Sequence, residues 1–394
     1  MAKKYDTPML DELKKGAFPS FITEIEKATE TADYAKDLLG LLERSFNEKK
    51  THWKHGGIVG VRGYGGGVIG RYSDIPDEFP GVAHFHTVRV NQPSGFFYTS
   101  DALREICDIW EKYGSGLTNM HGSTGDLVLL GTNTESLEPI FAELSSRGWD
   151  LGGSGSAMRT PSCCVGQARC EWANIDTMAI TNEITQHYQD EMHRPMFPYK
   201  FKFKVAGCAC DCIASIARAD MSIIGTWKGD IQIDQKEVAN YAKGGMDIQA
   251  EIIDMCPTQC MGYDGKAISI NNEHCNRCMH CIAKMTKALK PGKERGATIL
   301  LGSKAPIVTG ALLSWVIVPF MKMEPPFEEL KDLIDRIWEW WDEHGKNRER
   351  VGELIERLGF PTFLKGVDLE PHPAMVTEPR RDPFFFWSEE DIEK

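Results

Sequence analysis

Three closely spaced cysteines constrain the fold of this 394-residue chain more than any other feature. Cys275, Cys278 and Cys281 stand three residues apart, and Cys256, which precedes a proline, lies nineteen residues before the first of them. Thiolates at this spacing, completed by a distant Cys-Pro cysteine, are typical ligands of an iron–sulfur cluster. We therefore predict that these four cysteines hold one [4Fe–4S] cluster.

Two other interpretations of this cysteine run are weaker. A zinc ribbon normally uses two separate Cys-x2-Cys pairs, whereas here three cysteines share one run. A second cluster of the ferredoxin type would need a cysteine four positions after Cys281, where Met285 stands. Cys260 is in excess, and we interpret it as a small buried residue.

A second group of cysteines lies nearer the middle of the chain. Cys164 and Cys170 stand six residues apart, and Cys208 and Cys212 stand four apart. Four thiolates that converge on one point suit a soft metal or an iron–sulfur cluster.

The segment directly before the second pair alternates aromatic side chains with lysines. A period of two predicts a strand over residues 199–204 whose two faces differ. Lys200, Lys202 and Lys204 would then face something anionic, while the intervening phenylalanines enter the core. The alternative is a strand whose lysines face only solvent.

The composition excludes some partners and favours one compartment. A net charge of −12 argues against nucleic acid or an anionic membrane surface as the general partner, since both would repel the chain. The first residues lack the apolar core of a signal peptide, and the longest apolar run, 311–321, is too short to span a bilayer. Twelve cysteines without an export signal favour cluster ligation over disulfides, so we predict a cytoplasmic protein.

The length predicts two or three domains, and the residue pattern predicts an α+β fold. Residues 21–50 have apolar side chains at helical spacing and predict a helix. Ser100 or Asp101 can cap another helix, and residues 328–343 form a further one. The run 56–71 contains many glycines. Its backbone is expected to pass close to another body, such as a bulky flat ligand, unless the run is a surface turn.

Several longer motifs occur in the order found in one enzyme family. They resemble the alpha subunits of the dissimilatory sulfite reductase family, and the resemblance extends over most of the chain. The motifs occupy residues 51–57, 65–72, 114–119, 121–126, 159–161, 224–228, 277–282 and 287–292.

That resemblance implies the α+β fold of nitrite and sulfite reductases with an inserted bacterial-ferredoxin-like [4Fe–4S] domain. It implies a siroheme coupled to a [4Fe–4S] cluster, and a second [4Fe–4S] cluster in the inserted domain through which electrons enter. The implied reaction is the six-electron reduction of sulfite to sulfide, or to a product bound to a sulfur carrier. The implied partners are a homologous beta subunit in an α2β2 assembly, an electron donor and a small sulfur-carrier protein.

The family also implies a division of the chain. The expected parts are a helical clasp over 1–55, a ferredoxin-like half domain over 56–157, a siroheme domain over 158–240 and 297–365, the inserted domain over 241–296 and an aromatic tail over 366–394.

Roles for single residues follow from the motifs. Four cysteines would hold the cluster coupled to siroheme, with the last of them as the bridge to iron: Cys164, Cys170, Cys208 and Cys212. The cations expected at the reacting centre are Arg89, Arg159, Lys200 and Lys202. The residues expected to bind the cofactor are Arg71, Lys204, Thr118, Asn119, His121, Gly122, Ser123 and Thr124.

The chemistry of the ligands supports these roles. Siroheme carries several carboxylates and sulfite is an anion, so burial of either requires cations. Arginine binds carboxylates through two parallel hydrogen bonds and lysine supplies a point charge. Each such bond contributes about 1.5–3 kcal/mol. Sulfite reduction also consumes protons, which lysine ammonium groups and ordered water can donate.

Some positions depart from the family pattern. Ala209 and Cys210 stand where the family usually has Pro-Asn, and Cys163 adds a thiol beside Cys164. It is left open whether Cys163 or Cys210 takes the place of a predicted ligand.

Three alternative functions remain open. The chain could be a structural subunit with an inactive siroheme site that lends cations to the beta subunit's site. It could be a reverse-acting, sulfide-oxidising form. It could be a monomeric assimilatory enzyme, although the inserted ferredoxin module argues against that interpretation.

Overall fold

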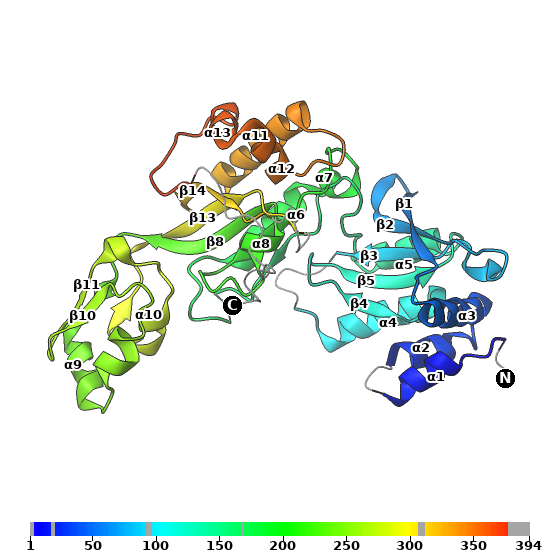
Figure 1. The fold of residues 1–394 in the computed structure, drawn as a ribbon, viewed down its shortest axis with the longest axis horizontal. Helices are drawn as coiled ribbons and strands as arrows, with labels where there is room; N and C mark the ends of the chain where they lie inside the picture. The colour runs from blue at the N-terminus through cyan, green and yellow to red at the C-terminus, as the bar shows by residue number, and fades with distance from the viewer. Residues whose placement is uncertain (1–3, 17–19, 92–96, 168, 306–311, 377–394) are drawn as a thin grey trace, which may run out of the picture. The chain divides into compact units, whose positions relative to one another are not determined.

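The computed structural model describes residues 4–16, 20–91, 97–167, 169–305 and 312–376, which form two compact units. Unit 1 comprises Met1–Thr160 and His187–Lys200, and unit 2 comprises Pro161–Gln186 and Phe201–Lys394. Each unit combines a five-stranded sheet with helices (Figure 1), which confirms the predicted α+β class. No helix within the described ranges is long and apolar enough to cross a membrane. Most of the expected aromatic tail lies outside the described residues.

The sheet of unit 1 is antiparallel throughout, in the order β1-β2-β3-β5-β4. Apolar residues of its strands share one core with helices α4 and α5, and in that core Val88, Leu129 and Trp110 are at most 1% exposed. These two helices therefore cover one face of the sheet. The elements are β1 (Trp53–Val61), β2 (Tyr64–Ser73), η1 (Pro80–Val82), β3 (His86–Val90), α4 (Ser100–Tyr113), β4 (Thr118–Met120), β5 (Leu127–Thr132), α5 (Leu137–Ser146) and α7 (Gln189–His193).

The strand register determines what lies on the other face. Residues directly opposite each other across paired strands point to the same face, and side chains alternate along each strand. His55 is opposite Arg71. Ile69 is opposite Thr87. Arg71 lies two residues after Ile69 on β2, and Arg89 lies two residues after Thr87 on β3. Arg71 and Arg89 therefore point to the same face as His55. The face away from α4 and α5 thus carries three basic side chains.

Three helices at the start of the chain, α1 (Pro8–Lys15), α2 (Ser20–Ala28) and α3 (Asp33–Glu48), form a second apolar cluster with Phe79 and Phe85. The single helix expected over residues 21–50 is wrong. A turn at 29–32 interrupts it, and Ala32 adopts an extended conformation before α3 begins.

The start of α4 also differs from the prediction. Neither Ser100 nor Asp101 caps this helix. Thr99 does, because its hydroxyl accepts a hydrogen bond of 3.1 Å from the Ala102 amide.

The glycine-rich run 56–71 packs against other parts of unit 1. A Cβ on Gly65 would lie 2.8 Å from Cδ of Pro195, and one on Gly67 would lie 2.6 Å from Cβ of Leu151. Gly67 also has a φ of +95°, which favours glycine. These two glycines therefore serve a close approach of the chain to itself.

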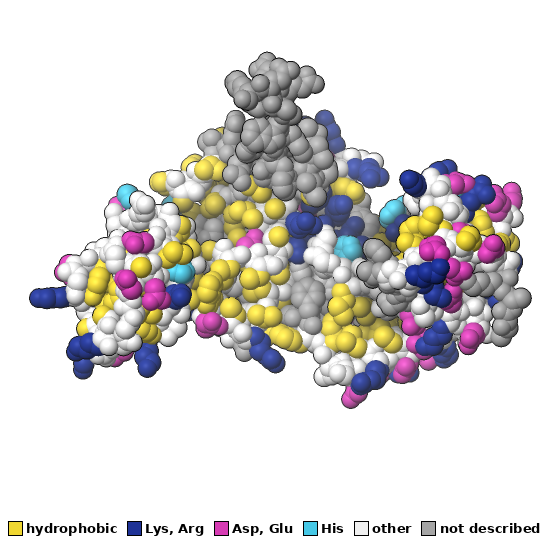
Figure 2. Space-filling view, turned by 60° about the horizontal axis from the view of Figure 1, so that its bottom comes forward, with side chains coloured by type: hydrophobic (Ala, Val, Ile, Leu, Met, Phe, Trp, Pro, Cys, Tyr) yellow, Lys and Arg dark blue, Asp and Glu magenta, His cyan; other side chains and the backbone are white. Residues whose placement is uncertain are grey.

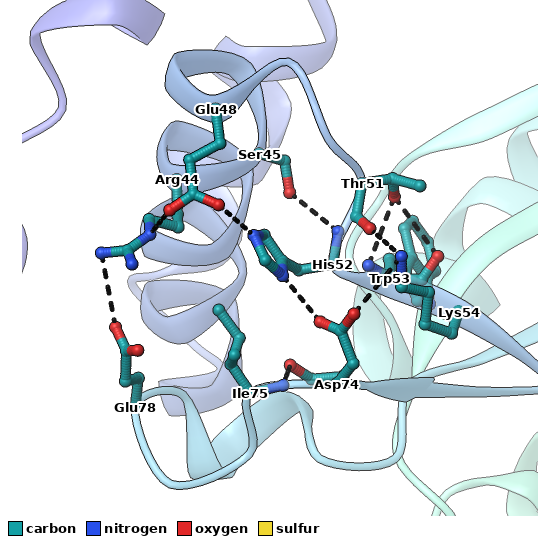
Figure 3. Close-up of polar contacts among 11 residues, drawn as sticks. Arg44, Ser45, Glu48, Thr51, His52, Trp53, Lys54, Asp74, Ile75 and Glu78 are labelled. Carbon is teal, nitrogen blue, oxygen red and sulfur yellow. Dashed lines mark hydrogen bonds and ion pairs between the residues drawn. The ribbon is translucent and has the colours of Figure 1, made fainter.

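His52 ties the N-terminal helices to the sheet (Figure 3). This imidazole is 3% exposed, with Nδ1 2.6 Å from Asp74 Oδ1 and Nε2 2.9 Å from Glu48 Oε2. Hydrogen bonding to His52 lowers the pKa of both carboxyl groups. The next residue is Trp53, and the Arg71 guanidinium lies 5.4 Å from the centroid of its ring. The His52 network thus anchors the ring over which Arg71 lies.

The sheet of unit 2 has the order β14-β13-β8-β7-β6, in which β6, β7 and β8 are parallel and β8, β13 and β14 are antiparallel. Helices α11, α12 and α13 lie together on one side of this sheet (Figure 1). The elements are β6 (Ser162–Cys163), α6 (Thr177–His187), β7 (Phe203–Ala206), α8 (Ser215–Arg218), β8 (Met221–Lys228), β13 (Glu294–Leu301), β14 (Trp315–Met321), α11 (Glu328–His344), α12 (Val351–Leu358) and α13 (Phe360–Gly366).

The lysine-rich strand expected over residues 199–204 is wrong in its extent. The strand begins only at Phe203, because the Lys202 amide donates to the Asp220 side chain rather than to a neighbouring strand. Phe201 and Phe203 enter the core as expected, at most 1% exposed, and both rings contact Trp338.

The inserted module leaves and rejoins the sheet of unit 2 at one point. Lys228 and Glu294 are partners in the β8–β13 pair, and the residues between them form the module. It lies at the end of β8 (Figure 1), and on its surface acidic and basic side chains are interspersed (Figure 2). Its elements are β9 (Gln232–Ile233), α9 (Gln235–Lys243), η3 (Gln249–Ile253), β10 (Met261–Tyr263), β11 (Ile268–Ile270), η4 (Asn272–His274), α10 (His280–Lys284) and β12 (Leu289–Lys290).

Asp220 is a buried acid that holds three parts of unit 2 together. Its carboxylate accepts two hydrogen bonds of 2.6 Å from the guanidinium of Arg350, and both side chains are at most 7% exposed. It also accepts the 2.8 Å bond from the Lys202 amide. One carboxylate thus connects the start of α12, the start of β8 and the segment before β7.

Replacement of Arg350 by Met is expected to lower the free energy of unfolding by about 3–5 kcal/mol, because Asp220 would remain buried without its cation. Urea unfolding measures this loss. The control is Arg104→Met, which breaks an exposed pair with Asp101 and is expected to cost less than about 1 kcal/mol. Equal losses in both variants would contradict the role of Asp220.

Candidate metal and anion sites

The four predicted cluster ligands of the inserted module border one cavity. Cys256, Cys275, Cys278 and Cys281 all line it. Burial, followed by the neighbouring thiols of Cys275 and Cys278, raises the pKa of Cys281 to about 12. These thiols therefore lie close enough to disfavour one another's ionisation, a situation that a bound metal reverses.

The loop around this cavity is shaped by two residues in the left-handed conformation, Arg277 with a φ of +58° and Met279 with a φ of +69°. The Arg277 amide donates to the Cys275 sulfur over 3.4 Å. Backbone amides aimed at sulfur stabilise the charge of a cluster and its thiolates. The loop conformation thus agrees with the predicted ligand role.

Within the described ranges, no three His, Cys, Asp or Glu side chains lie close enough to hold one metal ion. The four module cysteines border one cavity, and four thiolates are the ligand set of a [4Fe–4S] cluster.

Cys260 is a fifth thiol on the same cavity. It is 9% exposed, and its sulfur lies 3.6 Å from the sulfur of Cys256. Its burial agrees with the interpretation from the sequence, while its position makes it the nearest competitor of Cys256.

The second cysteine group lies where two neighbouring parallel strands end. Cys164 follows β6 and Cys208 follows β7 after one intervening glycine. Because β6 and β7 are parallel, their carboxyl ends meet at one edge of the sheet and bring the two cysteine loops together. The Gly207 amide donates to the Cys164 sulfur over 3.2 Å, which links the two loops directly.

The remaining thiols of this group lie near Cys208. Burial raises the pKa of Cys208 to about 12, and the Cys210 and Cys170 thiols add to that effect. Cys210 is exposed, whereas Cys163 is 1% exposed within the sheet. Cys210 thus lies near two predicted ligands, Cys208 and Cys170.

Arg71 and Arg89 form a cationic pair on the face of the unit 1 sheet that lies away from α4 and α5. The Nε atom of each is buried and has no hydrogen-bond partner among the described residues. Burial, and then the charge of Arg89, lowers the pKa of Arg71. Partial burial and both guanidinium groups also lower the pKa of His55. Two buried donors without acceptors beside concentrated positive charge fit an anionic ligand such as a siroheme carboxylate.

Asp126 is a site residue that the sequence did not single out. Its side chain is fully buried, and its Oδ2 accepts a 2.6 Å hydrogen bond from Arg89 Nη1. Thr124 donates to the same oxygen over 2.6 Å, and Thr160 donates to the other one. The carboxylate thus fixes one end of the Arg89 guanidinium, while the buried Nε of Arg89 has no partner among the described residues. The sequence could have pointed to Asp126, because this residue ends the motif 121–126.

The other candidate residues of unit 1 differ in their exposure to solvent. Thr118 and Asn119 lie exposed on β4 at the sheet edge. In the following loop, His121 Nδ1 is 2.8 Å from Thr124 Oγ1. Gly122 is exposed, and a Cβ there would meet nothing within 4 Å, while Ser123 is half-buried. This loop joins the Arg89 network through Thr124.

Two further cations of unit 1 have local contacts. Arg159 Nη1 donates to the Gly155 carbonyl over 2.6 Å. The Lys200 ammonium lies 4.9 Å from the centroid of the Tyr199 ring.

Lys204 is a buried cation of unit 2. It is 2% exposed, and its ammonium donates to the Ser162 hydroxyl over 3.2 Å. Burial lowers the pKa of Lys204 to about 8. Lys202, two residues earlier, is half-buried.

Comparison with known proteins identifies the family. Residues 154–373 match the family described as "nitrite and sulphite reductase 4Fe-4S domain", and residues 80–147 match the "nitrite/sulfite reductase ferredoxin-like half domain". These matches confirm the predicted fold.

Whole proteins show the same likeness. The "sulfite reductase, dissimilatory-type subunit alpha" of Nitratidesulfovibrio vulgaris is 53% identical, over 99% of this chain and 96% of its own length. The crystal structure of dissimilatory sulfite reductase I matches with a TM-score of 0.87 and 52% identity, over 98% of this chain and 96% of that one. A "subunit beta" of Archaeoglobus fulgidus is 24% identical over 90% of this chain and 93% of its own length. The chain belongs to the family of dissimilatory-type sulfite reductase alpha subunits.

Proposed function

We propose that this chain is the alpha subunit of a sulfite reductase that reduces sulfite to sulfide, or to a product bound to a sulfur carrier, in six electrons. The observation that carries the proposal is the convergence of Cys256, Cys275, Cys278 and Cys281 on one cavity, in a module inserted into the sheet that bears the second cysteine group. The module cysteines would hold one [4Fe–4S] cluster, and Cys164, Cys170, Cys208 and Cys212 would hold a second one coupled to siroheme. These groups would conduct electrons from an external donor to sulfite.

In this proposal the protein's cations hold the anions. Arg71 and Lys204 bind siroheme carboxylates, while Arg89, Arg159, Lys200 and Lys202 bind and orient sulfite. The unpaired Nε atoms of Arg71 and Arg89 support this assignment, because each offers a donor that no described residue accepts. Asp126 is a positioning residue that fixes the Arg89 guanidinium.

Lysine ammonium groups supply protons as the oxygens of sulfite leave. Lys200 and Lys202 take this role in the proposal. A proton donor works best when its pKa is close to the working pH.

An assembly with a homologous beta subunit is part of the proposal, and α2β2 is the arrangement we infer. The likeness of this chain to beta subunits supports it. An electron donor and a small sulfur carrier complete the set of partners. We place the protein in the cytoplasm, where thiols that bind clusters stay reduced.

The deciding experiment is anaerobic purification of the chain together with its beta subunit. The expected result is a coloured complex with the absorption of siroheme, iron and acid-labile sulfide for two clusters per alpha chain, and consumption of sulfite with a low-potential reductant. A colourless complex that contains zinc would refute the proposal. Siroheme without iron in the alpha chain would favour the structural-subunit alternative.

Cys275→Ala is expected to remove the iron of the module cluster, because the loop loses one of four ligands. Cys260→Ala is expected to retain that iron and serves as the matched control on the same cavity. Iron and acid-labile sulfide per chain measure the outcome. Loss of the cluster in Cys260→Ala but not in Cys256→Ala would transfer the fourth ligand role to Cys260.

Arg71→Met is expected to lower siroheme affinity about 10- to 150-fold, since it removes charge-assisted hydrogen bonds worth about 1.5–3 kcal/mol each. Siroheme absorbance per chain after dialysis measures this loss. Arg62→Met is the control, because Arg62 lies in the same hairpin but forms an exposed ion pair with Glu138. Unchanged siroheme content in Arg71→Met would contradict the assignment.

Lys204 predicts a pH dependence of siroheme retention. Its pKa of about 8 in the chain would rise when an anionic carboxylate binds beside it, so binding takes up a proton above pH 8. Affinity is therefore expected to be complete below pH 8 and to fall as the pH rises above it. Lys204→Met should retain less siroheme at pH 7 and lose this pH dependence between pH 7 and 10. If siroheme retention depends on pH equally in the native protein and in Lys204→Met, the pH dependence belongs to another group.

A further inference from the structure

The two cysteine groups of unit 2 are joined by a direct contact between their loops. Met279 stands between the predicted ligands Cys278 and Cys281, and it is 3% exposed. Its sulfur accepts a long hydrogen bond of 3.9 Å from Nδ2 of Asn174, which lies in the loop after Cys170. The side chain next to one cluster site thus contacts the loop that builds the other.

Asn174 continues this connection to a ligand of the second group. The backbone N–H of Asn174 donates to the Gly207 carbonyl over 2.7 Å. The backbone N–H of Gly207 in turn donates to the Cys164 sulfur over 3.2 Å. Three consecutive hydrogen bonds therefore lead from Cys164 to Met279.

The Asn174 side chain is buried and only partly hydrogen-bonded. Asn174 is 2% exposed, its Nδ2 also donates to the Trp172 carbonyl over 3.3 Å, and its Oδ1 is buried without a partner among the described residues. A buried acceptor without a bond destabilises a fold, so this side chain is a candidate for a role beyond packing.

A second line of contacts runs parallel to the first. Arg277 Nη1 donates to Thr226 Oγ1 over 3.3 Å, and its guanidinium lies 5.8 Å from the centroid of the Trp227 ring. Trp227 lines the cluster cavity and shares one apolar cluster with Cys208 and Met279. The module loop is thereby fixed to β8 on the side of the second cysteine pair.

We propose that Asn174, Trp227 and Met279 form the electron-transfer contact between the two cysteine groups, with Asn174 and Met279 as positioning residues that fix the distance between them. The inference rests on the proposed function. Each transfer moves one electron from the module centre to the centre beside siroheme, and no bond forms or breaks in the contact.

The test uses the anaerobic complex with the beta subunit and two variants, Asn174→Leu and Met279→Leu. Both remove the N–H to sulfur contact at nearly constant volume. Met285→Leu is the matched control, because Met285 is fully buried in the same apolar cluster but lies beyond the contact. After rapid mixing with dithionite and freezing, electron paramagnetic resonance follows the reduction of each centre separately.

All three variants are expected to retain native iron content and native reduction of the module centre. The centre beside siroheme should become reduced several-fold more slowly in Asn174→Leu and Met279→Leu, and at the native rate in Met285→Leu. Native rates in all variants, or equal slowing of both centres, would overturn the inference. Should Asn174→Leu fail to fold, Met279→Leu decides the question alone. Native protein without two clusters would instead refute the proposed function.

Discussion

The full-length pairing of β8 with β13 is the interaction on which the arrangement of unit 2 depends. Eight residue pairs, from Lys228 opposite Glu294 to Met221 opposite Leu301, join the two strands. On one side, β8 pairs with β7 in parallel, which brings the second cysteine group to the sheet edge. At its carboxyl end, β8 leads into the module with the first group. Both groups of thiols are thus positioned by one strand.

Buried carboxylates provide a second organising principle, one in each unit. Asp126 holds Arg89 in unit 1, and Asp220 holds Arg350 and the backbone of Lys202 in unit 2. In both cases a buried acid fixes a segment that carries a candidate anion-binding cation. A buried ion pair contributes little net stability, yet removal of one partner is costly. Such pairs therefore suit positions where geometry matters more than stability.

Local patterns predicted those features that depend on spacing within one segment. The run from Cys275 to Cys281 predicted a loop whose thiols lie together, and they do line one cavity. Alternation correctly placed Phe201 and Phe203 in the core. The fold class and the family likewise followed from motifs that the comparisons confirm.

Features that depend on distant partners could not be predicted in this way. The partner of Arg89 is Asp126, and only the pairing of β3 with β5 reveals that contact. The lysine-rich segment alternates as a strand should, but a side chain of Asp220 replaces the strand partner at Lys202. The glycines near Gly67 do approach another body closely, and that body is Leu151 of the same unit. Among adjacent capping residues at the start of α4, propensity alone does not distinguish Thr99 from Ser100.

The single point of departure and return at Lys228 and Glu294 makes the inserted module separable from its host sheet. A short hairpin linking these partners would preserve every residue pairing of β8 with β13. The host sheet can therefore close without residues 229–293, and the module is a separate structural element that hangs from a single pair of residues.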